Sequence, residues 1–215
     1  MSLRHALLAL LENRPMTGYE LAKQFDESAI YVWHAQHPQI YTELRKMEAD
    51  GLIDVSAARR GTKATKRTYF LTEAGASELT RWVSEPQQPP RERDPAYLKA
   101  IYFEFGSFAN ARRQFEAHLE HYRRLERQWR AHADQLERRD TDLIRRRLAR
   151  APEKAHDAIV DFKVHTYRGL IERAKVEVAW AKRGLAMVDR LERDAGIAEG
   201  DEVSPPQIDS IESSE

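Results

Sequence analysis

The sequence predicts a mainly α-helical protein in two parts, with one small β-hairpin in the N-terminal part. Apolar residues recur at steps of three and four over most of the 215 residues, which is the period of amphipathic helices. Charged residues make up 33% of the chain and glycine occurs only nine times, as expected for long helices with exposed polar faces. Two short runs, 52–55 and 68–71, have the composition of β-strands instead.

Two helices are expected before residue 26. The leucines between residues 3 and 11 give one amphipathic helix, which Asn13-Arg14-Pro15 ends. Thr17 and Glu20 have the spacing of a capping box, in which the hydroxyl and the carboxylate each accept a backbone N–H. A second helix is therefore expected to begin at this box and to reach about Phe25.

Residues 36–71 predict a third helix followed by a basic hairpin. Ile40, Leu44 and Met47 share one face of a helix that begins near residues 36–38 and ends at Asp50-Gly51, because glycine tolerates the left-handed conformation that closes a helix. Between the two strand runs there are five cations and no acid: Arg59, Arg60, Lys63, Lys66 and Arg67. A helix with a free polar face and a basic two-stranded wing are what duplex DNA requires of a winged helix-turn-helix domain.

A domain boundary is expected at the proline-rich segment 86–95. Thr72 is expected to cap a fourth helix that reaches about Val83 and completes a winged-helix DNA-binding domain over residues 1–85. Four prolines in residues 86–95 forbid a continuous helix and predict a semi-rigid linker. Residues 194–215 are acidic, lack apolar periodicity and are predicted to be a disordered tail.

The net charge of zero at first argues against a DNA-binding protein. Residues 194–215 hold seven acids and no Lys or Arg, so residues 1–193 carry 35 basic and 28 acidic residues, a net charge of +7. The local potential decides the attraction to phosphates, and the wing is a basic cluster. The acids of the tail therefore offset the net positive charge of residues 1–193.

Residues 96–193 are expected to form a helical dimerisation domain. Residues 96–105 predict one short buried helix, and two long helices follow, joined by the charged hinge 139–150 into an antiparallel hairpin. The apolar series of the two long helices are Phe108, Ala111, Phe115, Leu119, Tyr122, Leu125, Trp129, Ala133 and Leu136, and Ile159, Phe162, Thr166, Leu170, Ala174, Val178, Ala181, Leu185 and Val188. Two such stripes cannot cover each other completely, so a second copy of the chain is expected to complete their burial.

Composition and motifs exclude several other classes. The absence of cysteine excludes disulfides, cysteine–zinc sites and thiol catalysis. His118 and His121 are three residues apart on one predicted helix, but no third ligand is fixed by spacing, so no metal site is predicted. No glycine-rich phosphate loop or Ser-His-Asp arrangement is found, so neither an enzyme nor a cofactor is expected. No apolar run reaches the length of a membrane span, which predicts a soluble cytoplasmic protein.

The polar face of the third helix supplies the candidate base contacts. Gln39, Thr42 and Arg45 are expected to face the major groove, and Tyr41 or Lys46 to touch phosphate. The five wing cations are expected to touch phosphates that flank this site. The alternative is that all these side chains are ordinary solvated surface.

The tryptophans allow two interpretations. Trp33, Tyr69 and Trp82 are expected in the core of the winged helix. Trp129 and Trp180 lie in the helical domain, where they either pack as core residues or line a pocket for a small-molecule effector.

Three segments closely resemble the PadR family of bacterial transcriptional regulators. They read LLALLENRPMTGYELAKQF, WHAQHPQIYTELRKMEADGLI and TYFLTEAGASELTRWV, and the match covers residues 3–84. Residues 96–193 resemble the longer helical domain of the branch akin to virulence-gene activators. The sequence departs from the family at Met47, where leucine is common, and at residues 36–38, where the family often has a serine cap.

The resemblance implies a homodimer that binds a near-palindromic operator in double-stranded DNA, most often as a repressor. For some members it also implies a small aromatic or phenolic effector, or a cationic one. The alternative function is a winged-helix module for protein–protein interaction, which the acid-free wing disfavours.

Overall fold

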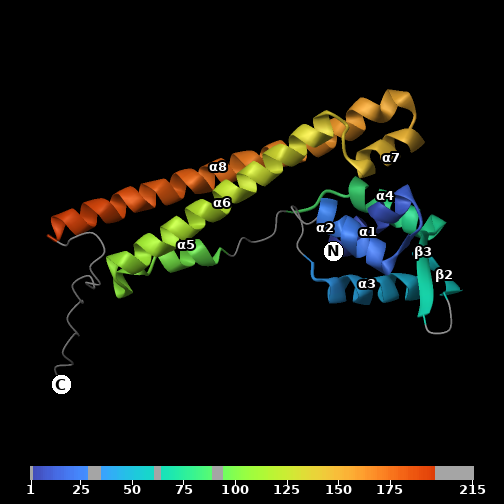
Figure 1. The fold of residues 1–215 in the computed structure, drawn as a ribbon, viewed down its shortest axis with the longest axis horizontal. Helices are drawn as coiled ribbons and strands as arrows, with labels where there is room; N and C mark the ends of the chain where they lie inside the picture. The colour runs from blue at the N-terminus through green and yellow to red at the C-terminus, as the bar shows by residue number, and fades with distance from the viewer. Residues whose placement is uncertain (1, 29–34, 61–63, 89–93, 197–215) are drawn as a thin grey trace, which may run out of the picture. The chain divides into compact units, whose positions relative to one another are not determined.

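A computed structural model describes residues 2–28, 35–60, 64–88 and 94–196 and divides the chain into two compact units (Figure 1). Unit 1 comprises Met1–Pro89 with Arg145–Pro152, and unit 2 comprises Pro90–Ile144 with Glu153–Glu215. The first division falls within the predicted linker 86–95. Residues 145–152, which we expected in the helical domain, belong instead with the winged helix.

Unit 1 has the element order of a winged helix-turn-helix. Its elements are α1 (Ser2–Asn13), β1 (Met16–Thr17), α2 (Gly18–Ser28), α3 (His37–Ala49), β2 (Ile53–Arg60), β3 (Ala64–Leu71) and α4 (Glu73–Ser84). The strands form an antiparallel sheet in the order β1-β3-β2. All four predicted helices are therefore confirmed, and α2 continues three residues past Phe25.

The sheet is larger than the sequence predicted. Strand β1 was not expected, and its two residues pair with Thr68 and Tyr69 of β3. The β2–β3 ladder runs from Ile53↔Leu71 to Arg60↔Ala64, so the prediction of strands confined to 52–55 and 68–71 was wrong. Four of the five wing cations consequently lie on the strands and not in a loop between them: Arg59, Arg60, Lys66 and Arg67.

The predicted capping residues hold the helix ends. Glu20 N donates to Thr17 Oγ1 at 3.2 Å and Thr17 N donates to Glu20 Oε2 at 2.8 Å, which is the expected capping box. Gly75 N donates to Thr72 Oγ1 at 3.1 Å at the start of α4. Gly51 has φ +71°, so it supplies the left-handed residue after α3.

The core of unit 1 forms where α1, α2, α3 and the sheet meet. Its fully buried side chains are Leu7, Leu8, Met16, Leu21, Phe25, Ile40, Leu44, Met47 and Ile53. Tyr69 is also buried, as predicted, whereas Trp82 is half-buried and stacks on His5. Trp33 lies outside the described residues.

The charged hinge between the long helices contains a helix of its own, α7 (Asp142–Arg150). The part of α7 that belongs to unit 1 is held on the C-terminal end of α1. Arg147 Nη1 pairs with Glu12 Oε2, and Arg150 Nη1 donates to the carbonyl of Asn13.

Unit 2 is built on the predicted antiparallel pair of long helices, α6 (Phe108–Glu137) and α8 (His156–Asp194), which lie side by side (Figure 1). Two ion pairs show that α6 and α8 run in opposite directions. Arg112 near the start of α6 binds Asp189 at 2.7 Å, and Glu137 at its end binds Arg168 at 2.6 Å. Shorter elements accompany them: α5 (Pro95–Ala100) and the 3₁₀ helices η1 (Phe103–Phe105) and η2 (Glu153–Ala155).

The predicted apolar stripe is wrong in the first half of α8. The buried residues there are Val160, Val164, Tyr167 and Ile171, whereas Phe162 is 76% exposed. From Ala174 onward the predicted and observed stripes coincide at Ala174, Ala181 and Val188. The first half of α8 is thus rotated from the expected face, and an aromatic ring is left in solvent.

The predicted buried helix over 96–105 is also wrong. The chain forms α5, a turn and η1, and none of the residues of the two helices is buried. Leu98, Ile101 and Phe105 are exposed because their apolar face has no cover from the described part of the chain. Asp94 caps α5 by accepting from Ala96 N at 2.8 Å, so Pro95 starts this helix and does not end the linker.

The acidic tail is described only at its start. α8 continues to Asp194 and Gly196 follows with φ +67°, while residues 197–215 lie outside the described part of the chain.

Removal of the Glu20 carboxylate should weaken the winged helix in a pH-dependent way. Hydrogen bonds from the Thr17 backbone and side chain lower the pKa of Glu20 to about 2, below its ordinary 4.5. Its stabilisation is therefore complete above pH 4.5 and is lost as pH falls towards 2. At neutral pH, Glu20→Ala should lower the free energy of unfolding by about 1 kcal/mol.

Urea denaturation across this pH range measures the effect. The control is Glu73→Ala, which removes an exposed first-turn acid of α4. A Glu20→Ala difference that stays constant down to about pH 3 would contradict the assigned pKa.

Candidate nucleic-acid interface

The exposed face of α3 carries all five of its predicted DNA-contacting residues. Gln39, Tyr41, Thr42, Arg45 and Lys46 are exposed, while Ile40, Leu44 and Met47 are buried on the other side. Neither Arg45 nor Lys46 forms an ion pair with a described residue. Both charges are therefore available to DNA.

Local hydrogen bonds determine which donors and acceptors of Gln39 and Thr42 remain available to a base edge. Gln36 N donates to Gln39 Oε1 at 2.9 Å, which supports the start of α3 in place of a serine cap and leaves the Gln39 amide NH₂ as a donor. The Thr42 hydroxyl donates to the Pro38 carbonyl at 2.9 Å, so its oxygen is presented as an acceptor.

Tyr41 lies over the N-terminal end of α2. A Cβ atom on Gly18 would come within 2.5 Å of Tyr41 Cε1, so a larger residue at position 18 would displace the ring from this place. Tyr19, the next residue of α2, is 72% exposed. Helix N-termini attract phosphates, so Tyr19 joins Tyr41 as a candidate phosphate contact. Tyr19 was not among the predicted contacts, although an aromatic residue at the second position after a capping threonine was a signal for it.

Only part of the wing lies among the described residues. The backbone places Arg59 and Arg60 on β2 and Lys66 on β3, but their side chains, and all of Lys63, lie outside the described part of the chain. Arg67 is described, and its Nη2 pairs with Glu48 Oε2 of α3 at 2.5 Å. Its guanidinium also lies 5.8 Å from the centre of the Tyr69 ring. Arg67 therefore connects β3 to α3, and a DNA phosphate would compete with Glu48 for it.

The two candidate effector tryptophans do not share a site. Trp180 packs against Tyr97, Phe115 and His118, with ring centroids 4.3–5.2 Å away. Trp129 is 14 residues beyond Phe115 on α6, about 20 Å along the helix axis. Trp129 is 5% exposed, and its Nε1 has no hydrogen-bond partner among the described residues.

A polar group lies beside Trp180. Tyr97 Oη donates to Glu177 Oε2 at 3.1 Å, and His118 Nε2 lies 3.0 Å from the same oxygen. Burial and the neighbouring Glu177 carboxylate raise the pKa of Tyr97 to about 12, so its phenol stays protonated. His118 is thus bound to Glu177, and no group of three metal-ligating side chains occurs among the described residues.

Comparison with known proteins places the chain in a family. Residues 7–81 match the model described as the transcriptional regulator PadR-like family. The negative transcriptional regulator PadR of Bacillus subtilis is 30% identical over 195 residues, which cover 87% of this chain and 98% of that protein. The chain belongs to the PadR-like family. A probable transcriptional regulator of Mycobacterium tuberculosis is 40% identical over 91 residues, 42% of this chain and about half (48%) of that relative.

Solved PadR-like structures share the fold over most of the chain. B. subtilis PadR in complex with operator DNA has a TM-score of 0.65 and 28% identity, covering 88% of this chain and 100% of that one. The virulence activator AphA of Vibrio cholerae has a TM-score of 0.61 and 28% identity, and the match covers 88% of this chain and 99% of that one. B. subtilis PadR in complex with p-coumaric acid has a TM-score of 0.62 and 27% identity, and the match again covers 88% of this chain and 99% of that one. The predicted family, its virulence-activator-like branch and the mainly helical winged-helix class are confirmed.

None of the helices that the structure describes is both long and apolar enough to cross a bilayer.

Substitutions on α3 should separate base reading from phosphate attraction. Arg45→Ala should weaken binding to the preferred duplex by about 1–3 kcal/mol and relax the base preference at one position. Lys46→Ala should weaken binding to all duplexes alike and lower the salt slope by about one unit. Fluorescence anisotropy over a salt series, on a duplex selected from random DNA, measures both effects. Equal loss on selected and random duplexes for Arg45→Ala would rule out a base contact.

Proposed function

We propose that this PadR-like protein is a homodimeric repressor that binds a near-palindromic operator and acts in the cytoplasm. The observation that carries the proposal is the exposed polar face of α3, with Gln39, Thr42 and Arg45 outward and a closed apolar core behind them. This is the surface with which a winged helix enters the major groove. The likeness to a negative regulator solved with operator DNA supports the same use here.

The other candidate contacts have a supporting role in this proposal. Tyr41, Lys46 and the added Tyr19 bind phosphates beside the groove, and the wing cations Arg59, Arg60, Lys63 and Lys66 bind flanking phosphates. Arg67 mainly holds the wing on α3 through Glu48, which differs from its predicted role as a free phosphate ligand.

The exposed apolar residues of unit 2 support dimerisation. Phe162 is exposed on α8, and Leu98, Ile101 and Phe105 are exposed on and after α5. Aromatic and aliphatic groups of this size are costly to leave in water. A second copy of the chain is the partner that a near-palindromic operator also requires.

Phe162→Asp should therefore weaken self-association. The substitution removes the apolar burial of the phenyl ring and places a charge in the contact. The dimer dissociation constant should therefore rise about tenfold or more. Analytical ultracentrifugation over a concentration series measures it. Val83→Asp is the control, because Val83 is a similarly exposed apolar residue of unit 1. Wild-type protein that sediments as a monomer at micromolar concentration would refute the dimer.

We place the proposed effector site at Trp129 and not at Trp180. Trp180 is already surrounded by three rings, whereas the buried Trp129 N–H has no acceptor among the residues that the structure describes. A phenolate or carboxylate oxygen would satisfy this donor. The complex of B. subtilis PadR with p-coumaric acid suggests a phenolic acid as the ligand.

Titration with p-coumarate tests the effector and its site together. Operator binding should weaken as p-coumarate is added, and Trp129→Phe should reduce the response while Trp180→Phe leaves it. The readout is release of a labelled operator duplex, with calorimetric titration of each variant. An equal response of both variants would remove Trp129 from the site, and no preference of the wild type for any duplex would favour the protein-interaction module.

A further inference from the structure

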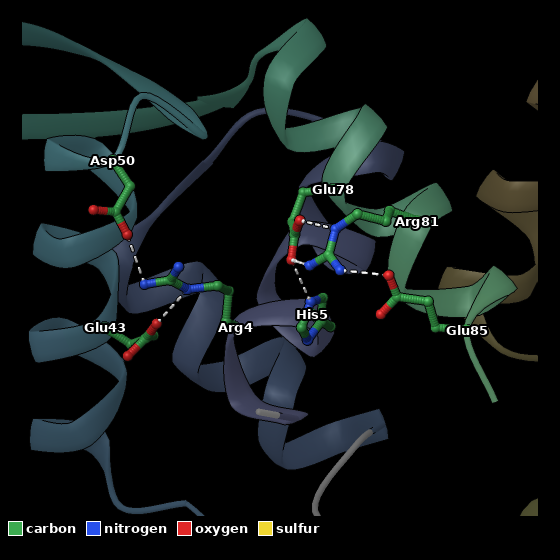
Figure 2. Close-up of polar contacts among 7 residues, drawn as sticks. All are labelled: Arg4, His5, Glu43, Asp50, Glu78, Arg81 and Glu85. Atoms are coloured by element: carbon green, nitrogen blue, oxygen red, sulfur yellow. Dashed lines mark hydrogen bonds and ion pairs between the residues drawn. The ribbon is translucent and has the colours of Figure 1, made fainter. Parts of the chain in front are cut away.

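A buried carboxylate lies on the inner face of the recognition helix. Glu43 of α3 is 6% exposed and is buried together with Ile40, Leu44 and Met47. A carboxylate in an apolar core is unfavourable unless a cation and hydrogen bonds satisfy it. Its partner is Arg4 of α1, whose Nε donates to Glu43 Oε1 at 2.8 Å (Figure 2).

The same guanidinium also binds the end of α3. Arg4 Nη2 lies 2.8 Å from Asp50 Oδ2, and Asp50 is the C-cap residue of α3. Glu43 and Asp50 are seven residues apart, so they share one side of the helix and are separated by about 10 Å along its axis. One arginine thus spans two turns of the recognition helix, which its forked planar geometry permits and a lysine ammonium does not.

The helix that carries Arg4 is itself anchored by the next residue. His5 is buried, its ring stacks on Trp82 at 4.5 Å between centroids, and its Nε2 lies 3.0 Å from Glu78 Oε1. Arg81 binds the same Glu78 through two nitrogens at 2.8 and 2.9 Å (Figure 2). Adjacent residues of α1 therefore bind opposite neighbours: Arg4 binds α3 and His5 binds α4.

The position of this contact matters for base reading. Arg45 follows Glu43 by two residues, a turn of about 200° on a helix, so the inner ion pair and the outer groove-facing arginine lie on opposite sides of α3. A rotation of α3 about its axis would carry Arg45 sideways across the groove. Hydrogen bonds to base edges need closely defined geometry, whereas attraction to phosphates does not.

We propose that Arg4 is a positioning residue for operator recognition, which fixes the rotation of α3 through Glu43 and Asp50. Arg4 does not touch DNA in this proposal, which rests on the proposed function. Its loss should lower the preference for the operator over random DNA and leave the affinity for random DNA nearly unchanged.

The test compares full-length variants on a selected operator duplex and on a scrambled duplex. Asp50→Asn is the main variant, because Asp50 is half-exposed and its loss leaves the buried Glu43 paired with Arg4. Arg4→Lys keeps the charge but can hold only one of the two acids. Glu85→Gln is the matched control for Asp50→Asn, because Glu85 is an exposed C-cap acid of α4 in the same unit, paired with Arg81.

Each variant should retain a cooperative thermal transition well above the assay temperature. Asp50→Asn and Arg4→Lys should each lose about five- to tenfold in operator affinity, the lower end of the loss expected for one displaced base contact. Their affinity for the scrambled duplex and their salt slope should match those of Glu85→Gln. A purely structural role for Arg4 would change the melting temperature but not the ratio of the two affinities.

The outcomes separate the two proposals. Wild-type protein that prefers the operator, with an unchanged preference in both Asp50→Asn and Arg4→Lys, would overturn the positioning role alone. Wild-type protein with no preference for any duplex would overturn the proposed function, and the positioning role with it. A reduced preference in the folded variants, absent from Glu85→Gln, supports the inference.

Discussion

The burial of α1 is the interaction on which the DNA-binding unit depends. This helix contacts α2, α3, α4 and β3, and its Leu7 and Leu8 are fully buried. Each buried leucine contributes about 1.5–3 kcal/mol. Because α1 is central, four of its polar residues bind neighbouring elements. Arg4 and His5 bind α3 and α4 near its start, and Glu12 and Asn13 bind α7 near its end.

Sequence patterns predicted the elements whose causes are local. The capping box at Thr17 and Glu20, the threonine cap at Thr72 and the glycine stop at Gly51 depend on residues within a few positions of one another. The exposed polar face of α3 was predictable for the same reason, because the helical period alone separates Arg45 from Met47.

Features that depend on distant partners were not predictable. Strand β1 has two residues and exists because Tyr69 of β3 pairs with Met16. In the first half of α8 the predicted apolar series, which includes Phe162, lies one or two positions from a second apolar series, which includes Val160 and Val164. The sequence favours neither series, and contact with α6 buries the second one. Glu43 was missed because a glutamate within a helix resembles solvated surface. Its burial follows from Arg4, 39 residues earlier.

Three chain connections join the two units and limit how unit 2 can act on unit 1. The chain passes from one unit to the other three times, at residues 89–90, 144–145 and 152–153, and not through a single proline-rich linker. Residues 145–152 are held on α1 by Arg147 and Arg150, while both of their ends continue into the helical unit. A change in the separation of those two ends must strain this segment or move it against α1. Because α1 also carries Arg4, a displacement of α1 would act on α3 through Glu43 and Asp50.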